Sequence, residues 1–168
     1  MKITRRGLLV ALLIGCIAAW PVLLAIEKLY DEPENYSRIE DGLWMGGNTP
    51  QPPPGVEAVL NLCEFEDSYR CDIHVWDPIR DAAPAPSIDW LKQKVEFIES
   101  QRGAGRTVYV HCFQGASRSG MVVVAYLMQK NGWTRDDAMA FVKSKRSQLR
   151  PNPAFMELLN EWERRIRA

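Results

Sequence analysis

The segment His111-Cys112-Phe113-Gln114-Gly115-Ala116-Ser117-Arg118-Ser119-Gly120 carries more information than any other part of this chain. An apolar, strand-like run (107–110) comes before it, and a helix-like run (121–129) follows it. A loop that closes onto a helix N-terminus turns several backbone N–H groups inward, and these donors together with the helix dipole favour a dianion. The segment therefore predicts a phosphate-binding loop at 113–118 with a thiol at its base.

The side chains of this segment predict nucleophilic attack on phosphorus. The field of the loop stabilises a thiolate, so Cys112 is expected to be a nucleophile at neutral pH. Arg118 offers a planar fork that can hold two phosphate oxygens and follow their charge into the transition state. Ser119 can donate its hydroxyl to the sulfur when a phosphoenzyme is cleaved. Glycine at 115 and 120 permits the tight loop and close packing of the helix.

These residues resemble the signature His-Cys-x5-Arg-Ser of cysteine-dependent phosphatases and, in the form His-Cys-x-x-Gly-x-Ser-Arg-Ser, the dual-specificity (VH1-like) protein phosphatases. The similarity extends over about residues 36 to 166. It includes segments like the family's opening strand, its "VLNL" strand, the helix behind the loop and a late Pro-Asn-x-x-Phe turn, which are 37–46, 59–62, 125–128 and 151–155. The resemblance implies a cysteinyl-phosphate intermediate, no metal or organic cofactor, and a supporting role for His111 in orienting the loop.

The pattern along the rest of the chain predicts an α/β fold with a mostly parallel central sheet flanked by helices. Ser87 is expected to cap a helix over 88–101, and Thr134 with Asp137 forms a capping box that opens another helix. Asn152 and Pro153 are typical of a helix start. Strand-like runs lie at 42–46, 57–62, 73–76 and 107–111.

A general acid must protonate the leaving group, and it must come from a separate loop. Residues 76–84 offer two candidates, Asp81 and Asp77. The run Pro78-Ile79-Arg80-Asp81 is similar to the family's Pro-x-x-Asp acid loop, which favours Asp81. Asp77 stands at a strand end, where it could also face the site, and it is the alternative acid.

The four cysteines, at 16, 63, 71 and 112, show no metal-ligand spacing. Cys63 follows the "VLNL" strand, whose C-terminal end should lie near the phosphate-binding loop of a parallel sheet. Cys63 is therefore a candidate resolving thiol that traps oxidised Cys112 as a disulfide. A reduced structural thiol is the simpler interpretation.

The N-terminal segment differs from the rest in composition. No charged residue lies between Gly7 and Ile26, whereas Lys2, Arg5 and Arg6 come just before this run. An apolar helix of that length, at ~1.5 Å per residue, spans about 30 Å, which matches the hydrocarbon thickness of a bilayer. The expected organisation is a membrane anchor, an acidic linker and a phosphatase-like catalytic domain, at 1–28, 29–36 and 37–168.

Two other interpretations of the N-terminus remain open. Residues 4–9 resemble a twin-arginine export signal, and residues 13–16 resemble a lipobox that would make Cys16 a lipid-anchored N-terminus. If the segment is an uncleaved single span, its basic N-terminal flank predicts a cytoplasmic N-terminus and an extracytoplasmic catalytic domain. An oxidising compartment conflicts with a free reactive Cys112, so the reverse topology also stays open.

The expected function is a protein tyrosine or dual-specificity phosphatase acting on phosphorylated protein. Lysine plus arginine and aspartate plus glutamate number 21 each, so a basic excess typical of nucleic-acid binders is lacking. A phospholipid or phosphoinositide phosphatase of the same fold is the alternative, made plausible by the membrane anchor. An inactive phosphate-binding adaptor is the second alternative, although it would require loss of Cys112 or Arg118.

Overall fold

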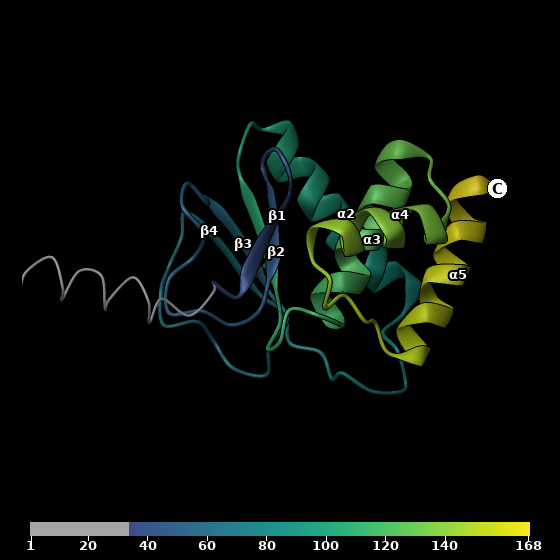
Figure 1. Ribbon diagram of the computed structural model, residues 1–168, viewed down its shortest axis with the longest axis horizontal. Helices are drawn as coiled ribbons and strands as arrows, with labels where there is room; N and C mark the ends of the chain where they lie inside the picture. The colour runs from purple at the N-terminus through teal and green to yellow at the C-terminus, as the bar shows by residue number, and fades with distance from the viewer. Residues whose placement is uncertain (1–33) are drawn as a thin grey trace, which may run out of the picture. The chain divides into compact units, whose positions relative to one another are not determined.

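The computed structural model describes residues 34–168. Four strands come first in this part of the chain, then a helix, a fifth strand and three more helices (Figure 1). The elements in chain order are β1 (Tyr36–Glu40), β2 (Leu43–Gly46), β3 (Ala58–Asn61), β4 (Ile73–Trp76), α2 (Ile88–Gly103), β5 (Val108–His111), α3 (Arg118–Asn131), α4 (Arg135–Lys145) and α5 (Pro153–Arg167).

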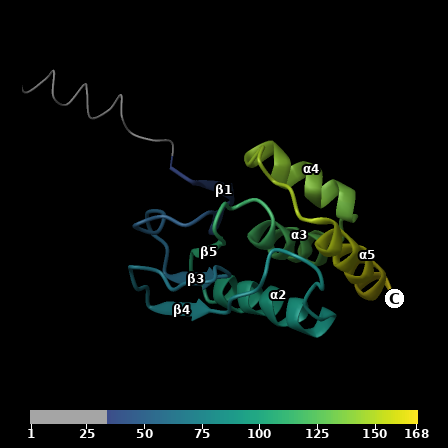
Figure 2. The ribbon, with the colours of Figure 1, turned by 90° about the horizontal axis from the view of Figure 1, so that it is seen from below.

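The five strands form one mixed sheet in the order β1-β2-β5-β3-β4. β1 pairs with β2 antiparallel, and the other three pairings are parallel. Figures 1 and 2 show α2, α3, α4 and α5 beside this sheet. The predicted α/β class and the mostly parallel sheet flanked by helices are therefore confirmed.

Side chains of the central strands alternate between two cores, because successive residues of a strand point to opposite faces. Leu60 and Val110 enter the large core that the helices cover. Val59 and Tyr109 enter a small cluster with Tyr69 on the opposite face. Every residue of β3 and β5 is buried, as expected for parallel strands that are covered on both faces. The phosphate-binding loop therefore begins at the end of a strand that is buried on both faces.

Helix α3 begins at Arg118, three residues before the run expected from the sequence, so Arg118 and Ser119 belong to its first turn. Residues 118–128 are all buried. The Trp162 Nε1–H of α5 donates to the carbonyl oxygen of Ala125 at 3.0 Å, and this contact packs α5 against the middle of α3. The helix behind the loop is thus enclosed by its neighbours.

The structure corrects one strand prediction and confirms three helix caps. The opening segment 37–46 is two antiparallel strands, because Gly42 in the turn adopts φ +73, which breaks an extended run. The side chains of Ser87, Thr134 and Asn152 each accept the backbone N–H of the third following residue.

The predicted membrane anchor at 1–28, Cys16 and most of the predicted linker lie outside the described residues. Among the helices of residues 34–168, none combines the length and hydropathy that a bilayer crossing requires.

Candidate active site

The loop between β5 and α3 packs closely against the end of β2. The Cys112 N–H donates to the Gly46 carbonyl oxygen at 3.2 Å, and the Asn48 N–H donates to the Phe113 carbonyl oxygen at 2.9 Å. Gly115 has φ +69, and a Cβ there would collide with the backbone of β2's last residue and its neighbour. Glycine at this position is therefore required both by the backbone conformation and by the space available.

Carbonyl oxygens of the loop are held from outside by a residue that the sequence analysis missed. The buried Arg146 donates from Nε to the Gly115 carbonyl oxygen at 2.5 Å and from Nη2 to the Gln114 carbonyl oxygen at 3.1 Å. The Arg150 N–H donates to the Ala116 carbonyl oxygen at 2.9 Å. The N–H of each of these planar peptide units points opposite to its C=O, so these donors face the centre of the loop. That arrangement is suited to an anion.

Cys112 and Ser119 lie together, as the sequence predicts. Cys112 is 1% exposed, and its Sγ lies 3.4 Å from the Ser119 hydroxyl oxygen. The same hydroxyl is within 3.3 Å of the Gly46 carbonyl oxygen. A hydroxyl has one hydrogen, so Ser119 can donate to the sulfur when its O–H bond rotates away from the Gly46 carbonyl oxygen, with no movement of the oxygen atom.

Arg118 is buried and anchored on one side of its guanidinium. Nη1 lies 2.8 Å from Glu64 Oε1, and it donates to the carbonyl oxygens of Leu62 and Ile79 at 3.3 and 3.1 Å. The hydrogen bond from Arg118 also holds the pKa of Glu64 below its usual range. Nε has no hydrogen-bond partner among the described residues, and Asp81 Oδ2 is 3.9 Å from it. A donor is thus available beside the candidate acid.

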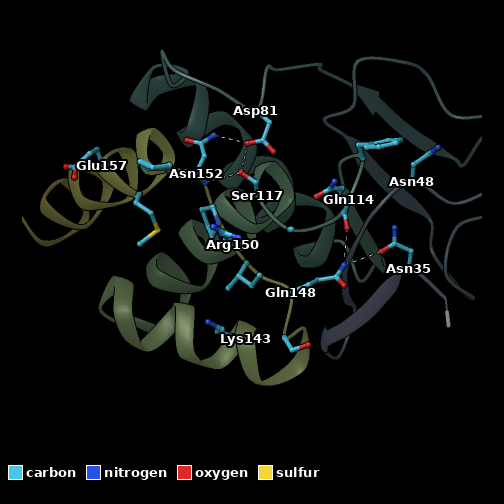
Figure 3. Close-up of a pocket in the computed structure, with 17 residues that line it drawn as sticks. Asn35, Asn48, Asp81, Gln114, Ser117, Lys143, Gln148, Arg150, Asn152 and Glu157 are labelled. Carbon is cyan, nitrogen blue, oxygen red and sulfur yellow. Dashed lines mark hydrogen bonds between the residues drawn. The ribbon is translucent and has the colours of Figure 1, made fainter.

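Asp81 is brought to the phosphate-binding loop (Figure 3). Its Oδ1 accepts the Ser117 hydroxyl at 2.5 Å and the Asn152 side-chain amide at 2.8 Å. The Asn152 backbone N–H donates in turn to the Ser117 hydroxyl oxygen at 3.1 Å. Asn152, predicted only as a helix cap, therefore also holds the candidate acid.

The side chain of Asp77 has different partners, both on helix α2. The Trp90 indole N–H donates to Asp77 Oδ2 at 3.0 Å, and the Lys94 ammonium forms an ion pair with the same oxygen. None of the contacts found in residues 34–168 joins Asp77 to the phosphate-binding loop. The structure therefore brings Asp81, and not Asp77, into contact with the phosphate-binding loop.

An open pocket adjoins the loop, and Figure 3 shows the side chains around it. Asp81, Ser117 and Phe113 line it together with residues from the start of α5. Phe113 is 51% exposed and packs edge-to-face on Phe65, which is 45% exposed, with ring centroids 5.8 Å apart. Phe113 therefore gives the pocket an exposed apolar edge, and Phe65 packs against the ring of Phe113.

The sequence profile of the catalytic domain of dual specificity phosphatases matches residues 53–165. The chain belongs to the dual specificity phosphatase family. Human Dual specificity protein phosphatase 1 is 35% identical over 119 residues, which cover 68% of this chain and 32% of that protein. The chain therefore spans about a third of the length of this curated relative.

Solved structures share the fold of this domain. Human DUSP28 aligns with TM-score 0.73 and 25% identity, covering 82% of this chain and 98% of that one. PTPMT1 in complex with PI(5)P aligns with TM-score 0.71 and 24% identity, covering 80% of this chain and 97% of that one.

The remaining sequence-predicted residues, His111 and Cys63, contact each other. His111 is buried, and its Nδ1 is 3.9 Å from Cys63 Sγ. Burial, reinforced by nearby Cys112, raises the pKa of the Cys63 thiol to about 12. The cysteines at 63, 71 and 112 are all free thiols. The resolving role of Cys63 stays a prediction.

Proposed function

We propose that this chain hydrolyses phosphomonoesters, phosphotyrosine above all, through a cysteinyl-phosphate intermediate. The observation that carries the proposal is the convergence of Cys112, Arg118 and Asp81. A buried thiol lies at the base of a loop of inward N–H groups, with a guanidinium and a separately supplied carboxyl group beside it. Each of the three groups has a role in phosphoryl transfer to sulfur.

In the first step Cys112 Sγ attacks phosphorus, so a P–S bond forms and the P–O bond to the leaving group breaks. Asp81 donates its proton to the departing oxygen. The inward loop amides and the guanidinium of Arg118 stabilise the charge that gathers on the three non-bridging oxygens. The products of this step are an alcohol or phenol and phosphocysteine.

In the second step the Asp81 carboxylate takes a proton from water, and the resulting hydroxide attacks phosphorus. The P–S bond breaks, and inorganic phosphate leaves. The Ser119 hydroxyl, 3.4 Å from Cys112 Sγ, stabilises the departing thiolate by donating a hydrogen bond. The thiolate and the protonated Asp81 are regenerated.

Two features of the pocket favour an aryl phosphate. The exposed Phe113 and Phe65 pair can contact the ring of a phosphotyrosyl residue at the mouth of the loop. The variable positions of the loop, 113, 114, 116 and 117, carry no lysine or arginine to meet a second headgroup phosphate. Protein phosphotyrosine, with phosphoserine and phosphothreonine as slower substrates, is therefore the proposed substrate class.

A phospholipid or phosphoinositide substrate is the second candidate. It is supported by the predicted membrane anchor and by the fold shared with PTPMT1, which was solved with PI(5)P. The third candidate, an inactive phosphate-binding adaptor, is disfavoured because Cys112 and Arg118 are both in place.

A substrate panel tests these candidates. Full-length protein would be assayed for phosphate release from phosphotyrosyl, phosphoseryl and phosphothreonyl peptides, phosphoinositides and phosphatidylglycerophosphate, with Cys112→Ser as the blank. Fastest release from the phosphotyrosyl peptide supports the proposal. Fastest release from a lipid would replace it with the second candidate, and release from none with the third.

We further propose that residues 1–28 form a single-pass anchor and that the catalytic domain is extracytoplasmic. The uncharged run 7–26 and the three basic residues before it support this topology. Protease added to intact cells or spheroplasts should cut the catalytic domain. A domain that stays uncut until the membrane is permeabilised would overturn the orientation.

A further inference from the structure

A buried carboxylate lies behind the phosphate-binding loop and takes no part in the mechanism above. The Asp67 side chain is 1% exposed, and its Oδ2 lies 3.0 Å from His111 Nε2, His74 Nε2 and Asn61 Nδ2 alike. The sequence pattern predicts no role for Asp67 or His74. This one oxygen lies within hydrogen-bonding distance of three nitrogens. Whether Asp67 is ionised therefore determines which of these nitrogens must carry a hydrogen.

Asp67 is an acceptor in this cluster. Burial opposes its ionisation, but the side-chain hydrogen bonds from His111 and His74 outweigh burial and hold the pKa of Asp67 below the usual range. An ionised carboxylate has no proton to donate. His111 must therefore carry a proton on Nε2, the nitrogen that faces Asp67.

The other nitrogen of His111 faces a thiol. His111 Nδ1 lies 3.9 Å from Cys63 Sγ, within reach of a sulfur hydrogen bond. In a neutral imidazole protonated on Nε2, Nδ1 has a lone pair and can only accept. Cys63 is then the donor in this contact and keeps its proton.

The protonation of Cys63 matters because a second buried thiol lies close by. Asn61 and His111 are paired in register at the ends of β3 and β5, so Cys63 and Cys112 both follow the same edge of the sheet. Two thiolates there would repel each other. The charged or titratable groups around Cys63 in the described residues include Cys112, Arg118, Asp67, Glu64, His111 and Tyr69.

We propose that Asp67 is a positioning residue that fixes His111 in its Nε2–H tautomer, so that His111 Nδ1 holds the proton on Cys63 and Cys112 is left as the thiol that ionises. The consequence for catalysis rests on the proposed function, but the tautomer does not. The cluster thus selects one nucleophile from two buried cysteines.

Nitrogen NMR of ¹⁵N-histidine-labelled protein tests the tautomer directly and needs no catalytic activity. His111 in the unmodified protein should be neutral at pH 7, with its proton on Nε2. Asp67→Asn, whose amide can donate as well as accept, should allow a detectable Nδ1–H population. A wild-type His111 that is protonated on Nδ1, alone or as imidazolium, would overturn the proposal even if the Asn variant failed to fold.

The pH dependence of kcat/KM tests the selection between thiols. Asp67→Asn should move the acid limb to higher pH by roughly 0.5 to 1 unit, because Cys63 then competes with Cys112 for the negative charge. In a Cys63→Ala background, the same substitution should leave the acid limb in place. An equal shift of the acid limb in both backgrounds would contradict the proposal, because Asp67 would then act on Cys112 without Cys63.

His74→Gln provides the matched control. It alters another neighbour of Asp67 Oδ2 but leaves the carboxylate and His111 in place. It should change neither the His111 tautomer nor the acid limb, and a shift as large as that of Asp67→Asn would contradict the role assigned to His111. If the enzyme assays show no turnover while the NMR result stands, the proposed function fails and the tautomer assignment remains.

Discussion

Asp81 and Asp77 are close in sequence, but their side chains contact different residues. Asp81 contacts Ser117 of the phosphate-binding loop, and Asp77 is bound to Trp90 and Lys94 of α2. We predict that Asp81→Asn slows turnover of substrates with poor leaving groups by ~10²- to 10⁴-fold, and of good leaving groups less, because an acid helps most where the leaving group is basic. Steady-state rates on a series of aryl phosphates, with Asp77→Asn as control, measure this. A larger effect of Asp77→Asn would make that residue the acid.

Arg118 contributes geometry as well as charge. Its Nη1 is fixed by Glu64 and two carbonyl oxygens, while Nε is available beside Asp81. We predict that Arg118→Lys lowers kcat/KM by about 10²-fold or more, since a single ammonium cannot keep these anchors and also bind two phosphate oxygens. The assay is phosphate release from a phosphotyrosyl peptide. Near-normal turnover would show that the guanidinium does not bind the transferred phosphoryl group.

At the level of elements, two helix caps provide a matched pair. Asn152 and Thr134 cap α5 and α4 with the same side-chain hydrogen bond, but Asn152 also donates to Asp81. Substitution of either by alanine should lower the free energy of unfolding by about 1 kcal/mol. We predict that Asn152→Ala lowers kcat as well, by roughly 10-fold from a misplaced acid, whereas Thr134→Ala leaves kcat unchanged. Urea titrations and initial rates measure both. Equal kcat in the two variants would remove Asn152 from the support of Asp81.

The features that could be predicted from the sequence are those that depend on residues close together in the chain. Caps such as Ser87 and the register of Cys112, Ser119 and Arg118 depend on residues a few positions apart, so they follow from local pattern. Glu64 and Arg146 contact the loop from segments that are distant in sequence. The residues next to them in the sequence carry no pattern that predicts these contacts. The turn at Gly42 was overlooked because the strand pattern continues on both sides of it.

At the scale of the whole molecule, Asp67 links stability to pH. Its pKa is lowered in the folded protein, so its ionised form favours folding at pH values above the usual aspartate pKa of ~3.9. This contribution is lost as the pH falls through the lowered pKa. We predict that the free energy of unfolding drops less steeply below about pH 4 in Asp67→Asn than in the unmodified protein. Urea unfolding at several pH values measures the slope, with the exposed Asp72→Asn as a control for net charge. Identical slopes in the unmodified protein and Asp67→Asn would contradict the role of the buried carboxylate.

The whole catalytic assembly predicts one covalent species. Rapid-quench mass spectrometry of full-length protein mixed with a phosphotyrosyl peptide should find phosphate on Cys112 during turnover, and both phosphocysteine and phosphate release should vanish in Cys112→Ser. Turnover that proceeds with no phosphate on Cys112, or that survives in Cys112→Ser, would contradict a mechanism built on this thiol.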